Sequence, residues 1–125
     1  SHEIRTPLTG LVGALELASA ASSSSERENF LGIARMSSEH LMQLLDDVLD
    51  FSRIEADQLI LHQQDVALQE IVRDAVSLMR PRAIAKGLYI EADLGQPLTL
   101  HTDPVRLRQI VVNLLSNAVK FSSTG

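Results

Sequence analysis

The first twenty residues, SHEIRTPLTGLVGALELASA (1–20), decide the fold of the N-terminal part of the chain. Apolar side chains recur in this stretch at intervals of four, three, four and three residues, at Ile4, Leu8, Leu11, Leu15 and Ala18. This spacing is that of a heptad seam, in which one stripe of an α-helix packs against a neighbouring helix. The stretch therefore predicts a helix over residues 1 to about 20 that needs a helical partner.

A second helix is expected directly after a polar loop at Ser22–Ser25. Ser25 and Glu28 have the S-x-x-E form of a capping box, so we expect this helix to run from Glu26 to about Ala56. Its apolar stripe comprises Phe30, Ala34, Leu41, Leu44, Leu45, Val48, Leu49 and Phe51. Two helices joined by a short loop form an antiparallel hairpin. Because one hairpin cannot cover so wide a stripe, we expect two hairpins to pair as a homodimeric four-helix bundle.

Residues 57–125 have a mixed pattern. Short strands are predicted at 59–61, 88–94 and 98–101. Apolar residues from Leu68 to Met79 recur at helical spacing, and this helix is expected to stop at Lys86-Gly87. Asp103-Pro104 predicts the start of a last helix that runs to about Phe121. The fold class is therefore α+β, with a helical hairpin at 1–56 and the N-terminal part of an incomplete domain at 57–125.

Composition excludes several kinds of function. The chain has 125 residues, no cysteine and a formal net charge of -5. An acidic chain without a basic stripe is a poor nucleic-acid binder, and without cysteine there is neither a disulfide framework nor a thiolate zinc site. The sequence contains no run of about 18 apolar residues, which is the length needed to span a membrane.

His2 is the first candidate for chemistry. With Ile4 and Leu11 at heptad position d, the residues His2, Glu3 and Thr6 fall on the outer face of the helix, and His2 and Thr6 are one turn apart. Pro7 lacks an amide hydrogen and crowds the carbonyl of Glu3, which loosens the first turn. Glu3 can accept an imidazole proton while the other ring nitrogen attacks an electrophile, and Thr6 can hold a water. The plain alternative is a solvated surface histidine, and a zinc site of the form H-E-x-x-H is disfavoured by Thr6.

SHEIRTPL resembles the phosphoacceptor box of sensor histidine kinases, H-E-x-x-T-P. Its sequence is most similar to that of the hybrid type. The hairpin resembles their dimerisation and histidine phosphotransfer domain, and FSRIEA (51–56) resembles the end of its second helix. The resemblance implies that His2 is phosphorylated and that Glu3 is its acidic neighbour. It also implies that Thr6 orients a water when the same domain dephosphorylates its partner.

The last helix carries the second candidate group. Asn113, Asn117 and Lys120 stand at i, i+4 and i+7 on one stripe. An amide oxygen is a fair Mg²⁺ ligand, and a lysine can meet phosphate as a point charge; a merely solvated polar face is the alternative. The expected packing face comprises Leu107, Ile110, Val111, Leu114, Ala118 and Phe121.

NLLSNAVKF (113–121) resembles the N-box of the Bergerat-type ATP-binding α/β sandwich, which histidine kinases share with gyrase-type ATPases and Hsp90 chaperones. The resemblance implies that Asn117 binds Mg²⁺ and phosphate and that Asn113 and Lys120 lie on the phosphate side. The gyrase and chaperone branches have a catalytic glutamate where this chain has Asn113. That difference favours the kinase branch over a gyrase-like ATPase.

The resemblance implies ATP and Mg²⁺ as cofactors, autophosphorylation of His2, and phosphoryl transfer to an aspartate of a response regulator. It implies a homodimer in the cytoplasm, within a longer protein anchored in the bacterial inner membrane. The alternative is a degenerate kinase that acts as a dimerisation and regulatory module. The glycine boxes of the family would follow Gly125, so we expect the chain to be a C-terminally truncated piece that is inactive alone.

Overall fold

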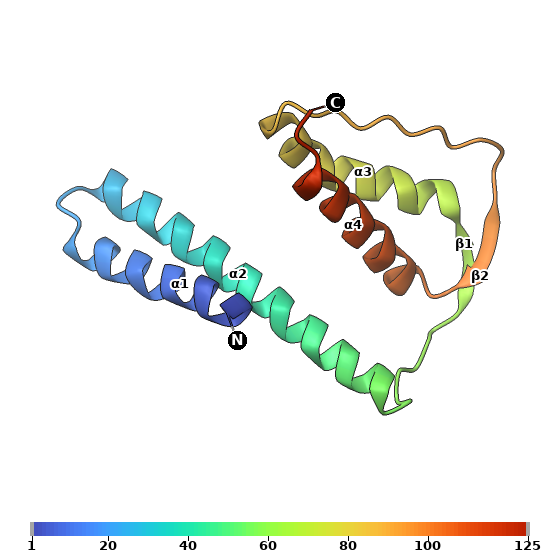
Figure 1. Ribbon diagram of the computed structural model, residues 1–125, viewed down its shortest axis with the longest axis horizontal. Coiled ribbons are helices and arrows are strands. Elements are labelled where there is room, and N and C mark those ends of the chain that lie inside the picture. Colours follow the sequence, from blue (N-terminus) through green and yellow to red (C-terminus); the bar gives the residue numbers. More distant parts are fainter. Residues whose placement is uncertain (1, 125) are drawn as a thin grey trace. The chain divides into compact units, whose positions relative to one another are not determined.

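The computed structural model describes residues 2–124. Its helices and strands follow in the order α1 (His2–Ala20), α2 (Ser24–Glu55), β1 (Gln64–Ala67), α3 (Leu68–Ala85), β2 (Thr99–Thr102) and α4 (Pro104–Phe121) (Figure 1). The chain divides into two compact units, the first ending at Leu59 and the second beginning at Ile60. Among the described helices, none combines the length and apolarity needed to cross a membrane.

The first unit is the antiparallel hairpin of α1 and α2 (Figure 1). Small side chains let the two helices approach closely, and a Cβ added at Gly10 would meet Ser37 Oγ at 3.1 Å. The side of α1 with the least exposed side chains comprises Ile4, Pro7, Leu11, Ala14 and Ala18. The predicted seam is thereby split, because Leu8 and Leu15 remain 45% and 46% exposed.

The start of α2 differs from the predicted capping box. Ser23 is the N-cap, and its hydroxyl accepts a hydrogen bond from the Glu26 amide at 3.2 Å. Ser25 lies inside the helix, so the capping box predicted at Ser25 and Glu28 is wrong. The run of serines offers the same S-x-x-E spacing at Ser23 and Glu26. The extended backbone of Ser23, with φ -127° and ψ 155°, lets its hydroxyl reach the free amide.

The second unit packs α3 against α4 beside a two-stranded antiparallel sheet, in which Gln64 pairs with Thr102 and Ala67 with Thr99. Met79, Ala83, Leu88 and Val119 form its buried cluster, and Ile90, Val112 and Leu115 pack against it. The strand predicted at 98–101 is confirmed as β2, shifted by one residue. Both predicted helices are confirmed as α3 and α4.

Two predicted strands are wrong. Residues 59–61 form no strand, because β2 pairs with residues 64–67 instead. Residues 88–94 also form no strand. A strand must exchange backbone hydrogen bonds with a neighbouring strand, and β1 and β2 pair with each other and not with this segment. The alternation in that segment has another cause, which is that Leu88 and Ile90 turn toward the core of the unit. Periodicity alone reports burial on one side and not hydrogen-bonded pairing.

Asp103 starts α4 as predicted and also holds the chain that enters the second unit. Oδ1 of Asp103 accepts hydrogen bonds from the backbone amides of Val105 and Arg106 at 3.0 and 3.3 Å, and Oδ2 accepts one from the amide of His62 at 2.9 Å. The amide of His62 contributes most to lowering the pKa of Asp103 below its ordinary value of 3.8, against the opposing effect of burial. One carboxylate therefore fixes both the first turn of α4 and the segment that follows α2.

Candidate functional site

His2, Glu3 and Thr6 lie on the first turns of α1, and all three are exposed. The Thr6 hydroxyl donates a hydrogen bond to the backbone carbonyl of His2 at 3.0 Å. The helix runs through Pro7 without interruption, and the proline ring is buried. The structure thus places the imidazole and the threonine at the solvent-facing start of one continuous helix.

The hydrogen bond of Thr6 limits what this hydroxyl can do for a water. Its proton is given to the His2 carbonyl, so only its oxygen lone pairs remain, and these can accept a hydrogen from a water. Glu3 and His2 share no hydrogen bond in the described part of the chain, as is usual for adjacent residues on a helix. The Glu3 carbonyl also receives no helical hydrogen bond from Pro7, which has no amide hydrogen.

Asn113, Asn117 and Lys120 lie together on an exposed stripe of α4. Neither asparagine side chain makes a hydrogen bond within residues 2–124, so both amide groups are available to a ligand. The Lys120 ammonium lies 5.2 Å from the centre of the Phe121 ring, in a cation–π contact, and has no carboxylate partner in that range. This stripe offers two amides and one cation to an anionic ligand.

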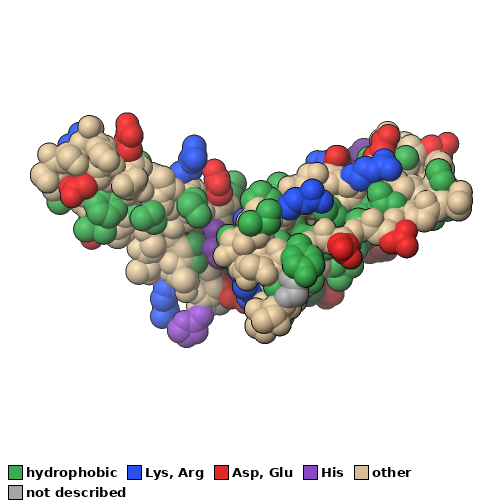
Figure 2. All heavy atoms as spheres, turned by 90° about the horizontal axis from the view of Figure 1, so that it is seen from above, with side chains coloured by type: hydrophobic (Ala, Val, Ile, Leu, Met, Phe, Trp, Pro, Cys, Tyr) green, Lys and Arg blue, Asp and Glu red, His purple; other side chains and the backbone are tan. Residues whose placement is uncertain are grey.

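The packing face of α4 differs from the prediction. Leu107 and Val111 are partly buried as expected, and Val112, Leu115 and Val119 complete the face that meets the core. Four residues of the predicted face are instead exposed: Ile110, Leu114, Ala118 and Phe121. The helix has apolar residues on two sides, and the sequence pattern does not tell which side packs against α3. Hydrophobic side chains accordingly remain among the charged ones on the surface (Figure 2).

The donor set at α4 suits Mg²⁺ held together with phosphates better than an all-protein metal site. Within the described residues, no three His, Asp or Glu side chains cluster as metal ligands. Mg²⁺ commonly takes one or two protein oxygens and completes its shell with water and substrate phosphates. Asn117 can be such a ligand, and Lys120 can neutralise phosphate charge beside it.

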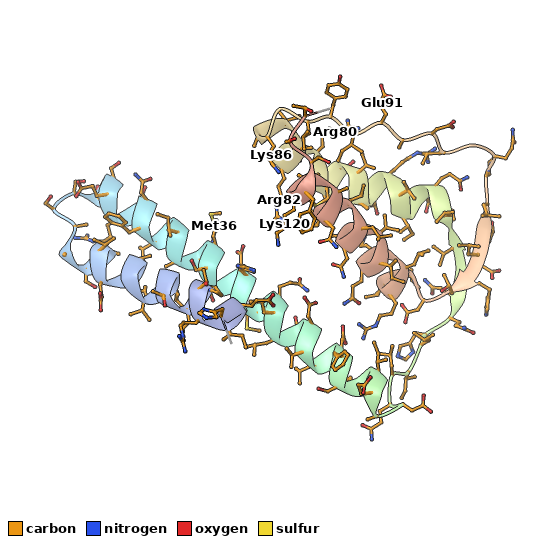
Figure 3. The ribbon with its side chains drawn as sticks, in the orientation of Figure 1. Met36, Arg80, Arg82, Lys86, Glu91 and Lys120 are labelled. Carbon is orange, nitrogen blue, oxygen red and sulfur yellow. The ribbon has the colours of Figure 1, made fainter. Side chains whose placement is uncertain are left out.

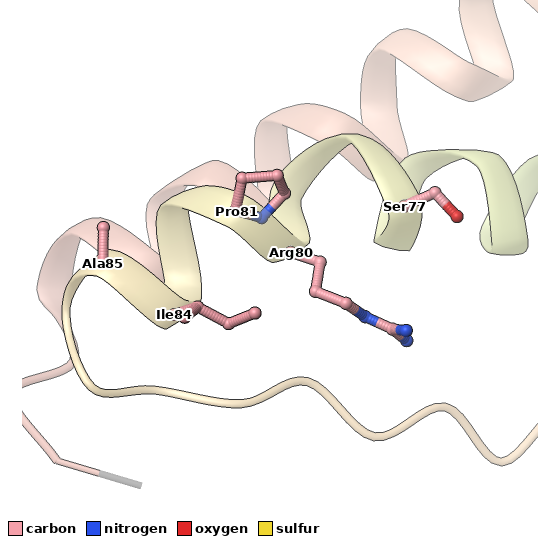
Figure 4. A pocket seen from close by; sticks show the side chains of 5 residues that line it. All are labelled: Ser77, Arg80, Pro81, Ile84 and Ala85. Atoms are coloured by element: carbon pink, nitrogen blue, oxygen red, sulfur yellow. The ribbon is translucent and has the colours of Figure 1, made fainter.

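An open hollow of about 540 Å³ lies beside α3, lined by Ser77, Arg80, Pro81, Ile84 and Ala85. Figure 4 shows Arg80 and Ile84 pointing from α3 into the space beside the extended segment that follows it. None of the predicted site residues lines this hollow. The candidate chemistry therefore rests on the exposed stripes of α1 and α4.

The sequence predicts Lys86 only as part of a helix stop, whereas in the structure its ammonium group donates hydrogen bonds to carbonyls at the end of α4. The residue is the C-cap of α3, directly before Gly87. A lysine at such a position can bond the last carbonyls of its own helix. Nothing in the local sequence shows that it bonds another helix 33 residues or more along the chain.

Comparison with known proteins relates the first unit to a known domain. Residues 1–57 match the model of the His Kinase A (phospho-acceptor) domain. The whole chain is 39% identical over 127 residues to Sensor protein GacS of Pseudomonas syringae pv. syringae, and covers 14% of it. It is 39% identical to the Autoinducer 2 sensor kinase/phosphatase LuxQ of Vibrio parahaemolyticus, and covers 15% of that protein. The chain thus spans about one seventh of these relatives.

Solved structures show the same fold. Acinetobacter baumannii histidine kinase AdeS matches all of this chain with a TM-score of 0.74 at 26% identity, over 62% of its own chain. Full-length ShkA in complex with AMPPNP matches 99% of this chain with a TM-score of 0.69 at 37% identity, over 27% of its own. The predicted fold class, a helical hairpin followed by part of an α/β unit, is confirmed by these matches, whereas the dimeric bundle stays a prediction.

Proposed function

We propose that the chain belongs to a protein-histidine kinase that phosphorylates itself on His2, on the premise that residues 1–57 match the His Kinase A (phospho-acceptor) domain and that the whole chain is similar to a segment of sensor histidine kinases. The observation that carries the proposal is the exposed imidazole of His2 at the start of α1, inside H-E-x-x-T-P and inside the matched domain. Incubation of the full-length protein with γ-labelled ATP tests it, and acid-labile label on His2 is the expected result.

In the first step the unprotonated ring nitrogen of His2 attacks the γ-phosphorus of ATP. A nitrogen–phosphorus bond forms as the bond from phosphorus to the β-phosphate oxygen breaks, and ADP leaves with that electron pair. The proton on the other ring nitrogen is then lost, and the Glu3 carboxylate on the same turn is its nearest acidic acceptor in sequence. His2 must be solvent-facing for this reaction, as it is on α1.

The stripe on α4 is proposed to hold the nucleotide. Asn117 would offer its amide oxygen to Mg²⁺, while Asn113 and Lys120 would meet the phosphate oxygens. The metal, when bound, spreads the negative charge that develops on the phosphates. ATP as the donor also implies that this part of the protein lies in the cytoplasm.

In the second step the phosphoryl group is proposed to pass from His2 to an aspartate. The partner is the receiver domain of a response regulator, either a separate protein or a part of the same chain in a hybrid kinase. A carboxylate oxygen attacks phosphorus, the nitrogen–phosphorus bond breaks, and the imidazole regains a proton from solvent. His2 is exposed on α1, as contact with a receiver domain requires.

Thr6→Ala is expected to separate the two activities of the domain. The hydroxyl of Thr6 is bonded to the His2 carbonyl, so it can accept a hydrogen from a water near the imidazole but is not the nucleophile. Loss of phosphate from the receiver aspartate should slow by roughly tenfold or more, since losing one hydrogen bond of about 1.4 kcal/mol to the attacking water changes a rate by about that factor. Autophosphorylation should remain near its original rate, as measured by label on His2.

Thr9→Ala is the matched control, because Thr9 is also an exposed threonine of α1. Thr6→Ser retains the hydroxyl and should restore the loss of phosphate from the aspartate. Equal loss of autophosphorylation and of aspartate dephosphorylation in Thr6→Ala would show that the threonine supports only the helix.

We also propose that two hairpins pair as a four-helix bundle. Several large apolar side chains of the hairpin remain exposed in a single chain: Leu8, Val12, Leu15, Leu45, Val48 and Leu49. Packing of such a stripe against a second copy removes apolar surface from water and stabilises the dimer. Leu8 and Leu15 belong to the heptad seam but not to the least exposed side of α1, so they are free for this contact.

Leu15→Asp is therefore expected to dissociate the dimer without unfolding the hairpin. In a dimer the carboxylate would be buried without a partner, a change that typically costs several kcal/mol. In the single chain the same carboxylate stays solvated, because Leu15 is 46% exposed. Sedimentation should show monomers for Leu15→Asp and dimers for Thr9→Asp, which adds the same charge to an exposed polar site. A Leu15→Asp protein as dimeric as the original would contradict the bundle.

A further inference from the structure

The ammonium group of Lys86 joins the end of α3 to the end of α4. Its Nζ donates hydrogen bonds to the backbone carbonyls of Val119 at 2.7 Å, Lys120 at 2.9 Å and Ser122 at 3.0 Å. Figure 3 shows Lys86 and Lys120 at these neighbouring helix ends. An ammonium has three hydrogens, so these three carbonyls use all of its donors.

The backbone around Lys86 is arranged to bring the side chain there. Lys86 is the C-cap of α3, and Gly87 follows with φ +70°, a conformation that favours glycine. The Leu88 amide then bonds the Ala83 carbonyl at 2.9 Å, and Leu88 enters the same buried cluster as Val119. The two helix ends are thus packed together beneath the lysine.

The bonds of Lys86 meet a real need of α4. The last carbonyls of a helix have no amide partner inside it, and the negative end of the helix dipole favours a cation. After Phe121 the backbone turns to the extended conformation at Ser122, with φ -87° and ψ 141°. Lys86 therefore fixes both the last turn of α4 and the direction in which the chain leaves it.

That last turn carries part of the proposed nucleotide site. Lys120 lies on it directly, and Asn117 lies one turn earlier on the same stripe. Since its donors are all used within the protein, Lys86 has none left for a phosphate. We propose that Lys86 is a positioning residue that holds Asn117 and Lys120 in place for Mg-ATP, an inference that rests on the proposed function of this stripe.

Lys86→Met tests the proposal, because methionine keeps much of the aliphatic stem and removes the charge and all three donors. In the full-length protein the dissociation constant of Mg-ATP, measured by calorimetry, should rise by roughly tenfold, as expected for lost charge-assisted hydrogen bonds. Hydrogen exchange at the Ser122 amide, which bonds the Ala118 carbonyl at 3.0 Å, should become faster. Transfer from phosphorylated His2 to the receiver aspartate should be unchanged, since α1 carries that step.

Arg82→Met is the matched control, as Arg82 is a cation in the last turn of the same helix and has no bond to α4 within residues 2–124. It should bind Mg-ATP like the original protein. Lys86→Arg keeps a charged donor and should restore most of the affinity. If Lys86→Met does not fold, as judged by circular dichroism, Lys86→Gln keeps two donors and should give an intermediate affinity.

An unchanged dissociation constant in folded Lys86→Met or Lys86→Gln would overturn the proposal. Equal slowing of phosphoryl transfer from His2 would also overturn it, since it would indicate a general loss of structure. Failure of the proposed function has a different signature, namely that the unmodified full-length protein neither binds Mg-ATP nor incorporates label on His2.

Discussion

Replacement of His2 by glutamine is expected to abolish phosphoryl incorporation from ATP completely. Glutamine keeps a polar side chain at the start of α1 but has no nitrogen lone pair that can attack phosphorus. Because His2 is exposed, the substitution removes no buried contact, and the hairpin should keep its fold. The measurement is acid-labile label on the full-length protein after incubation with γ-labelled ATP.

His40→Gln is the matched control, since His40 is another exposed histidine on the hairpin. This variant should be labelled like the unmodified protein. Acid-labile label that persists in His2→Gln would show that another residue is the acceptor, and the proposal for His2 would be wrong.

The same experiment separates the kinase from the alternative of a regulatory module. A degenerate kinase would still form the dimer that Leu15→Asp disrupts, but the unmodified protein would take up no label. Asn113, Asn117 and Lys120 are exposed on one stripe of α4. Because an ordinary solvated helix face is also polar and exposed, the label on His2, and not this stripe, separates the kinase from the regulatory module.

The helices were predictable from the sequence because their signals are local. Asp103-Pro104 places a capping carboxylate before a proline, and the heptad spacing of α1 extends from Ile4 to Ala18, over about four turns. The capping serine of α2 was missed because the serine run allows the same spacing in two registers, and only backbone conformation chooses Ser23.

The strands and the packing of α4 were less predictable because they depend on partners distant in the sequence. Whether residues 88–94 form a strand depends on a neighbouring edge, and whether Leu114 or Leu115 faces α3 depends on how two helices meet. Lys86 shows the same limit at the site, because its three carbonyl partners lie on a different helix end. Sequence patterns predicted the polar side chains on the exposed stripes of α1 and α4. They did not predict the hydrogen bonds by which Lys86 joins the ends of α3 and α4.

Asn117→Ala is expected to lower the rate of autophosphorylation by about a hundredfold or more, since a lost metal contact removes several kcal/mol of charge stabilisation in phosphoryl transfer. The alanine should be tolerated on α4, because Asn117 is exposed and makes no side-chain hydrogen bond within residues 2–124. Label on His2 measured against time and Mg²⁺ concentration gives the rate.

Asn29→Ala is the matched control, because Asn29 is an exposed helical asparagine on α2 that has no proposed ligand. It should be labelled at the original rate.

A second measurement isolates the nucleotide step. A phosphorylated receiver domain should still pass its phosphoryl group back to His2 in Asn117→Ala, since that reaction needs only the imidazole on α1. If Asn117→Ala takes up label from ATP as fast as Asn29→Ala does, the stripe on α4 is a solvated surface and the nucleotide must be held elsewhere. If both ATP labelling and back-transfer are lost, the substitution acts on the acceptor side, and the division of roles between α1 and α4 is wrong.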